Sequence, residues 1–197
     1  MSGLRFLSPS QCPPETVTSP LRRALDTESD TVVRKLDGSE AESGTRRSVE
    51  DMSLQGVVEV RGDLGLVRAN DGEELVRLSP RRGYLFTAGD PFEVVARLRE
   101  AGLLGYDATG TLAGLALEGE QLMRRLTDLD LDRLPAAGPF ARVSALVLRD
   151  EGERFRVYVP QELGHDTALA VLDAIQGLAS AGTPPTGIRL KPDPSTS

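Results

Sequence analysis

His165 is the only histidine in the chain, so it is the only candidate base for a Ser-His-Asp or Cys-His catalytic group. It lies near the start of the last predicted helix, between Gly164 and Asp166, on a side that we expect to be exposed. We therefore interpret His165 as a surface residue. No Walker loop, dinucleotide-binding glycine pattern, His-Glu-x-x-His motif or paired-cysteine motif occurs. The residues themselves assign no catalytic, cofactor-binding or metal-binding side chain.

A second candidate for chemistry is the run Asp128-Leu129-Asp130-Leu131-Asp132, which begins like the calcium loop of an EF-hand. The pattern then fails, because Arg133 occupies the position of the sixth-position glycine and Pro139 that of the bidentate glutamate. Because leucines alternate with the aspartates, we interpret the run as a solvent-exposed edge that lies over a buried layer, and not as a metal site.

Cys12 is the only cysteine, so no disulfide can form within the chain, which is typical of a reducing cytosol. It stands beside Pro13-Pro14 in a segment without apolar periodicity, and we interpret it as an incidental exposed thiol. The apolar run near Met1 is too short for a secretory signal. We expect a cytoplasmic protein.

Composition narrows the function classes further. The 197 residues carry a formal charge of −7, which argues against electrostatic capture of nucleic acid. No stretch approaches the roughly 18 apolar residues of a membrane span. Aromatic residues make up only 4% and tryptophan is absent, so the core must be built mainly from Leu, Val and Ala. We expect no nucleic-acid or membrane partner.

The chain divides into three parts. Residues 1–48 are rich in Ser, Thr, Pro and charged residues and should be mostly disordered, with one helical turn that begins at Ser19, the N-cap, and Pro20. Residues 49–180 carry the apolar patterns of one α+β domain. Residues 181–197, rich in Pro and Gly, should form a flexible tail.

Short apolar runs within the middle part predict its strands and helices. Asp90-Pro91 begins a helix with Phe92 on its apolar face, and Gly102 ends it. Residues 120–126 form a second helix. A third is predicted by the apolar stripe of Leu163, Thr167, Ala170, Val171, Ala174, Ile175 and Leu178. Phe155, Val157 and Val159 alternate with more polar residues and predict a half-buried strand, paired with 143–148. The remaining predicted strands are 56–61, 65–68, 75–78, 83–87 and 111–117. Without long βαβ crossovers, this order favours α+β over a doubly wound sheet.

Two segments of the domain echo each other. Asp51-Met52-Ser53 and Asp107-Ala108-Thr109 share the pattern Asp-x-Ser/Thr, and each precedes a strand that ends in a charged residue and a glycine. Turn-strand-turn segments often look alike, so the echo alone indicates little.

The order of the motifs along residues 50–178 resembles the gamma subunit family of heterotetrameric sarcosine oxidase and, more distantly, the folate-binding superfamily of the glycine-cleavage T-protein. The segments that carry the resemblance are Ser19-Pro20-Leu21, Val58–Asp63, Arg77–Pro80, Gly83–Phe86, Asp107–Thr109, Ala116–Met123, Leu126–Leu131, Leu134–Gly138, Phe140–Val143 and Phe155–Pro160. The lack of tryptophan and the long polar N-terminal segment depart from the family pattern.

The resemblance implies a T-protein-like fold of mixed sheets with packed helices. It also implies an accessory, non-catalytic subunit of an enzyme that demethylates sarcosine to glycine, with one-carbon transfer to tetrahydrofolate. FAD, FMN, NAD and tetrahydrofolate would then be bound by the larger flavin-containing partner subunits, and none by this chain. A free-standing folate-binding domain of the T-protein superfamily is the alternative.

Overall fold

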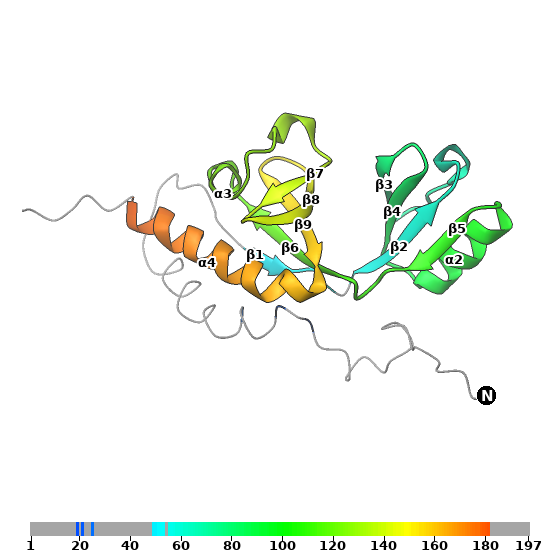
Figure 1. Ribbon diagram of the computed structural model, residues 1–197, viewed down its shortest axis with the longest axis horizontal. Coiled ribbons are helices and arrows are strands. Elements are labelled where there is room, and N and C mark those ends of the chain that lie inside the picture. The colour runs from blue at the N-terminus through cyan, green and yellow to red at the C-terminus, as the bar shows by residue number, and fades with distance from the viewer. Residues whose placement is uncertain (1–18, 20, 22–24, 26–48, 54, 182–197) are drawn as a thin grey trace, which may run out of the picture.

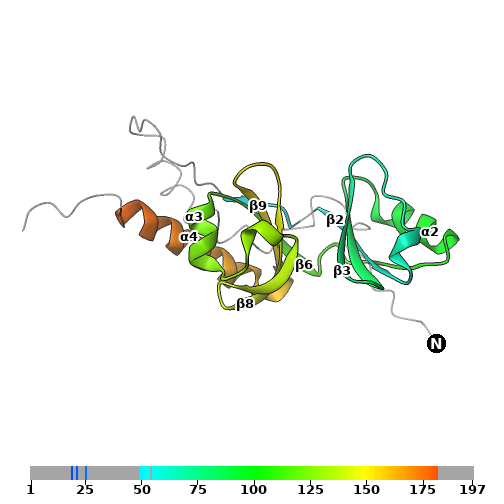
Figure 2. The same ribbon diagram turned by 90° about the horizontal axis from the view of Figure 1, so that it is seen from above.

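The computed structural model describes residues 19, 21, 25, 49–53 and 55–181 (Figure 1). The N-terminal segment predicted to be disordered and the tail predicted to be flexible lie outside these residues, apart from residues 19, 21, 25 and 181. The described part contains two antiparallel sheets and three α-helices, so the predicted α+β class is confirmed. Figure 2 shows the two sheets side by side, with a helix on the outer side of the smaller one.

The smaller sheet has the strand order β3-β4-β2-β5. Its strands are β2 (Gly56–Arg61), β3 (Glu73–Ser79), β4 (Arg82–Thr87) and β5 (Leu104–Asp107). Helix α2 (Pro91–Glu100) covers one face and begins as predicted, because the Asp90 carboxylate accepts a hydrogen bond from the Phe92 amide at 2.9 Å. It ends before Gly102, whose φ of 77° suits a residue without Cβ.

The larger sheet has the order β1-β6-β9-β8-β7. Its strands are β1 (Val49–Asp51), β6 (Leu112–Glu118), β7 (Ala136–Phe140), β8 (Val143–Arg149) and β9 (Arg154–Pro160). One face is covered by α3 (Glu120–Leu126) and α4 (Gly164–Ala181). Alternate residues of β6, β8 and β9 point into this core, which therefore has the period of two that the sequence shows.

A helical turn from the N-terminal segment joins this larger core. The Ser19 hydroxyl accepts a hydrogen bond from the Leu21 amide at 3.0 Å, and the Leu25 amide donates to the Leu21 carbonyl at 3.0 Å. The predicted N-cap is thus confirmed. Leu21 is fully buried and Leu25 packs against the same cluster, so this turn contributes to the core of the domain.

The two echoing segments have the same local structure. Asp51 accepts a hydrogen bond from the Ser53 amide and Asp107 from the Thr109 amide, both at 2.9 Å. The hydroxyl of each motif then accepts an amide hydrogen from the sheet that the chain has just left: Ser53 from Gly114 of β6 at 3.1 Å and Thr109 from Val57 of β2 at 3.0 Å. The two segments are therefore matched crossovers between the sheets.

The second face of β9 packs against the smaller sheet. Tyr158 is 2% exposed and its ring centroid lies 4.5 Å from that of Phe86, while its hydroxyl donates to Gln55 at 2.6 Å. The prediction that β9 is half-buried is therefore wrong. Contact between the sheets buries the face that carries Arg156 and Tyr158 as well, and the sequence period of β9 alone does not show this.

Arg156 makes an ionic link across the sheet contact. Its guanidinium pairs with Glu74 of β3 at 2.5 Å and with Asp150 of the β8–β9 turn at 2.8 Å. Burial disfavours the charged form, but the hydrogen bonds to Glu74 and Asp150 raise the pKa of Arg156 above its ordinary value. The arginine is thus held charged between the sheets.

Three further predictions differ from the structure. Residues 65–68 are not a strand, because Asp63 accepts a hydrogen bond from the Gly65 amide at 2.9 Å and starts a 3₁₀ turn over Leu64–Leu66. Phe92, expected on the apolar face of α2, is 36% exposed. On the last helical stripe, Leu163 and Ala170 are only partly buried, because they lie toward the edges of the face that packs on the sheet. The other residues of the stripe expected to be buried are buried as predicted: Val171, Ala174 and Ile175.

We expect the stability of the protein to fall at alkaline pH through Tyr158. Burial raises the pKa of this phenol above its ordinary value of about 10. The stabilisation is therefore complete below about pH 10 and is lost as the pH rises through the folded-state pKa. Urea unfolding from about pH 8 to pH 11 should show a shallower loss of the free energy of unfolding for Tyr158→Phe than for the wild type.

At neutral pH the variant should have a free energy of unfolding lower by about 1 kcal/mol, because it lacks the hydrogen bond to Gln55. Parallel pH profiles for the two proteins would contradict the assignment.

Candidate functional site

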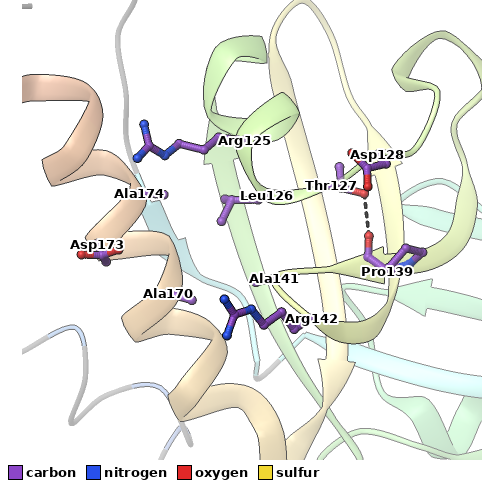
Figure 3. Close-up of a pocket in the computed structure, with 10 residues that line it drawn as sticks. All are labelled: Arg125, Leu126, Thr127, Asp128, Pro139, Ala141, Arg142, Ala170, Asp173 and Ala174. Carbon is purple, nitrogen blue, oxygen red and sulfur yellow. Dashed lines mark hydrogen bonds between the residues drawn. The ribbon is translucent and has the colours of Figure 1, made fainter. Parts of the chain in front are cut away.

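A groove of about 630 Å³ lies between the C-terminal end of α3, the β7–β8 turn and the middle of α4 (Figure 3). Its volume falls in the range of small-molecule sites, about 300–1,000 Å³. The residues that line it are Arg125, Leu126, Thr127, Asp128, Pro139, Ala141, Arg142, Ala170, Asp173 and Ala174.

Hydrogen bonds fix the β7–β8 turn to the end of α3. The Ala141 amide donates to the Leu126 carbonyl at 2.7 Å, and the Thr127 hydroxyl donates to the Pro139 carbonyl at 2.6 Å. The same hydroxyl accepts from the Leu129 amide at 3.2 Å. Two walls of the groove are therefore one connected unit.

The turn between β7 and β8 is strained. Ala141 and Arg142 connect the paired residues Phe140 and Val143, and their φ values are 46° and 71°. Two-residue hairpin turns with two positive φ angles favour Asn-Gly, and a residue with a Cβ costs roughly 1–2 kcal/mol in this region. Figure 3 shows that this backbone directs the Arg142 guanidinium toward α4. Such strain is concentrated at functional sites, which favours a role for Arg142.

Small residues of α4 leave room for the second arginine. A Cβ added to Gly177 would lie 3.0 Å from an Nη atom of Arg125, so the guanidinium lies against the glycine backbone. Ala170 and Ala174 form the apolar wall below it (Figure 3). The groove therefore combines apolar walls with two guanidinium groups.

Binding, and not proton transfer, is the chemistry that these groups can perform. A guanidinium stays protonated in proteins and presents donors in a planar fork that matches a carboxylate or a phosphate. Ion pairs among the described residues involve three other arginines near the larger sheet, namely Arg124, Arg133 and Arg149. They involve neither Arg125 nor Arg142 of the groove. Asp128 and Asp173 also line the groove and limit its net positive charge.

Of the residues that the sequence singled out for chemistry, only Asp128 lines the groove. His165 is half-buried in the first turn of α4 and does not line the groove. Asp130 accepts a hydrogen bond from the Asp132 amide at 3.2 Å, and Asp132 pairs with Arg149 at 3.2 Å. Cys12 lies outside the described residues.

Within the described ranges, no three His, Cys, Asp or Glu side chains are grouped so that they could hold a metal ion. Across the same residues, no helix has the length and apolar character needed to cross a membrane.

Sequence reasoning missed the groove. Arg125 and Arg142 are separated from Ala170 and Ala174 by tens of residues, and only the folded arrangement of α3, the hairpin and α4 brings them together. The pair Ala141-Arg142 carries none of the Asn or Gly residues that mark a tight hairpin turn. The sequence pattern places both alanines in the apolar stripe of the last helix and gives no sign of a groove.

Neither a protein-family model nor a curated protein matches the chain. Among solved structures, heterotetrameric sarcosine oxidase from Corynebacterium sp. U-96, in complex with pyrrole 2-carboxylate, contains a chain similar to this one. The match has a TM-score of 0.69 at 15% identity and covers 85% of this chain and 99% of that one. It shows a shared fold and supports the predicted T-protein-like architecture.

Two other solved structures are similar at lower TM-scores. Glycine cleavage system aminomethyltransferase T from Bartonella henselae has a TM-score of 0.47 at 14% identity, over 65% of this chain and 46% of that one. The regulatory subunit of aspartate kinase from Thermus thermophilus has a TM-score of 0.39 at 14% identity, over 67% of this chain and 99% of that one.

Proposed function

We propose that the chain is a non-catalytic, gamma-like subunit of a heterotetrameric sarcosine oxidase. The observation that carries this proposal is the match to a chain of such an enzyme, which spans 99% of that chain and 85% of this one. In this role the protein supports the oxidative demethylation of sarcosine to glycine, with transfer of the one-carbon unit to tetrahydrofolate. The reaction itself belongs to larger flavin-containing subunits.

The accessory role follows from the chemistry of the reaction. Oxidation of an N-methyl amine needs an acceptor for a hydride or for electrons, and side chains alone cannot serve as one. In our proposal FAD, FMN, NAD and tetrahydrofolate are bound by the partner subunits. This chain offers exposed surfaces and a groove lined by two arginines, and both can bind another molecule.

A free-standing folate-binding domain is the second candidate function, and the groove is the observation that favours it. Folates carry an aromatic ring system and a glutamate tail with carboxylates. The apolar wall of Ala170 and Ala174 suits the body of such a ligand, and the guanidinium groups of Arg125 and Arg142 suit its carboxylates. This donor set fits a folate tail.

We expect the isolated chain to show no turnover of sarcosine. Purified protein supplied with sarcosine, FAD and FMN should form neither hydrogen peroxide nor formaldehyde, and activity should appear only when the flavin-carrying partner subunits are added. The partners are obtained by purifying the tagged chain from its native cell. Turnover that follows the isolated chain through every purification step would overturn the accessory role.

The same preparation separates the two candidate functions. A folate that binds only the native state raises the melting temperature by mass action. Tetrahydrofolate should leave the melting temperature of the isolated chain unchanged if the first proposal is correct. A rise that is lost in Arg142→Ala would instead favour the folate-binding domain. Arg133→Ala, which removes an exposed arginine outside the groove, is the matched control.

A further inference from the structure

One face of the smaller sheet is covered only in part. The row nearest the larger sheet contains Val57 and Phe86, which pack in one cluster with Tyr158. Because opposed residues of antiparallel strands share a face, the next two rows outward hold residues of β5, β2, β4 and β3 on the same side. These rows are Tyr106-Glu59-Tyr84-Val76 and Leu104-Arg61-Arg82-Ser79.

The β3 end of the first of these rows is covered, because Val76 is buried and Tyr84 packs beside it in the cluster with Tyr158. The β5 end of both rows carries large apolar side chains that are exposed. Tyr106 is 50% exposed and Leu104 is 57% exposed, on the short strand β5 at the edge of the sheet. We name the set Glu59, Arg61, Arg82, Leu104 and Tyr106 the platform. Helix α2 covers the opposite face of this sheet, so the platform faces the side of the larger sheet, from which the smaller sheet diverges (Figure 1).

The platform is held in one arrangement by its own contacts. Glu59 accepts hydrogen bonds from Arg61 and from Arg82, both at 2.8 Å. The Arg61 guanidinium also lies 5.7 Å from the centroid of the Tyr106 ring. Although burial opposes its ionisation, these two arginines lower the pKa of Glu59. A preordered surface loses little side-chain entropy when it binds.

Its charge indicates what it would bind. The platform has two arginines, about half-exposed, for one carboxylate, in a chain whose formal charge is −7. Exposed Arg81, in the turn between β3 and β4, adds to the local positive charge. A second copy would bring a net charge of the same sign, which opposes association. An acidic partner surface with an apolar centre is complementary, and Tyr and Arg are the residues most enriched at binding hot spots.

We propose that the platform is the docking surface for a larger partner subunit, which covers Tyr106 and Leu104 with an apolar patch and faces Arg61 and Arg82 with carboxylates. The inference rests on the proposed function for the kind of partner and on the platform geometry for the place. It assigns the exposed end of the smaller sheet to assembly.

The test measures binding of the partner subunit that co-purifies with the tagged full-length chain in equimolar amount. Tyr106→Ala should weaken binding about 30-fold or more, the effect of losing a hot-spot residue. Arg61→Ala combined with Arg82→Ala should flatten the decrease of affinity with rising salt. Leu169→Ala is the control, because Leu169 is an exposed apolar residue of α4, which packs on the larger sheet. Unchanged unfolding curves show that each variant is folded.

The possible outcomes separate the two proposals. Binding of a flavin-carrying partner that is equally strong in all variants would overturn the docking surface and leave the proposed function standing. Loss of binding in Tyr106→Ala with a flavin-free acidic partner would support the surface and overturn the sarcosine oxidase role. Self-association of the pure chain that Tyr106→Ala abolishes would make a second copy the occupant and contradict our choice. Failure of any partner to co-purify would overturn both.

Discussion

Replacing Ile175 by alanine is expected to lower the free energy of unfolding by about 2–5 kcal/mol. Ile175 is 2% exposed and lies in the core that α4 shares with β6 and β9. The change removes buried methyl groups and leaves a cavity that the rigid sheet can fill only in part, and both effects destabilise the folded state. Chemical denaturation monitored by circular dichroism measures the difference directly.

Leu169→Ala on the same helix is the matched control for this prediction. Leu169 is 38% exposed, so its truncation should change the free energy of unfolding by no more than about 0.5 kcal/mol. The comparison removes helix propensity as an explanation, because both variants place alanine in α4. An effect of Ile175→Ala below about 1 kcal/mol would mean that α4 is loosely attached to the sheet.

Local signals explain what could be predicted from the sequence. The start of α2 could be predicted because Asp90-Pro91 satisfies the free amides of the first helical turn. This requirement involves only a few neighbouring residues. The limits of β2 and α3 agree with the prediction for the same reason, since glycines and apolar runs mark them. Capping and periodicity act over distances that a single sequence displays.

Non-local contacts explain what could not be predicted. Arg156 has the pattern of a solvent-facing strand residue, and its burial depends on Glu74, which lies 82 positions away in the sequence. The strands β1, β5 and β7 are short and become strands only by pairing with β6, β2 and β8. Edge strands of this kind gain their hydrogen bonds from a neighbour and carry little apolar pattern of their own.

The candidate site shows the same limit more strongly. A groove lined by exposed arginines and helix alanines has no motif, because its chemistry needs only donors and shape. His165, Asp130 and Asp132 attract notice by residue type, but they do not line the groove, and of that aspartate run only Asp128 does. By contrast, the weak Asp-x-Ser/Thr echo marks real structural equivalence, since both copies form the same turn and accept an amide from the sheet that the chain has just left.

Replacing Leu21 by alanine should also cost about 2–5 kcal/mol, although composition predicts little stability from residues 1–48. Leu21 is fully buried in the larger core, and its amide donates to the hydroxyl of Ser19, the N-cap.

Two variants serve as controls. Leu25→Ala should cost less, because Leu25 is only partly buried. Ser19→Ala should cost about 0.5–2 kcal/mol through loss of the cap. Thermal and chemical unfolding of the full chain measure all three. If Leu21→Ala left both curves unchanged, the core would be complete without Leu21. The expected loss makes this residue of a polar segment an integral part of the domain.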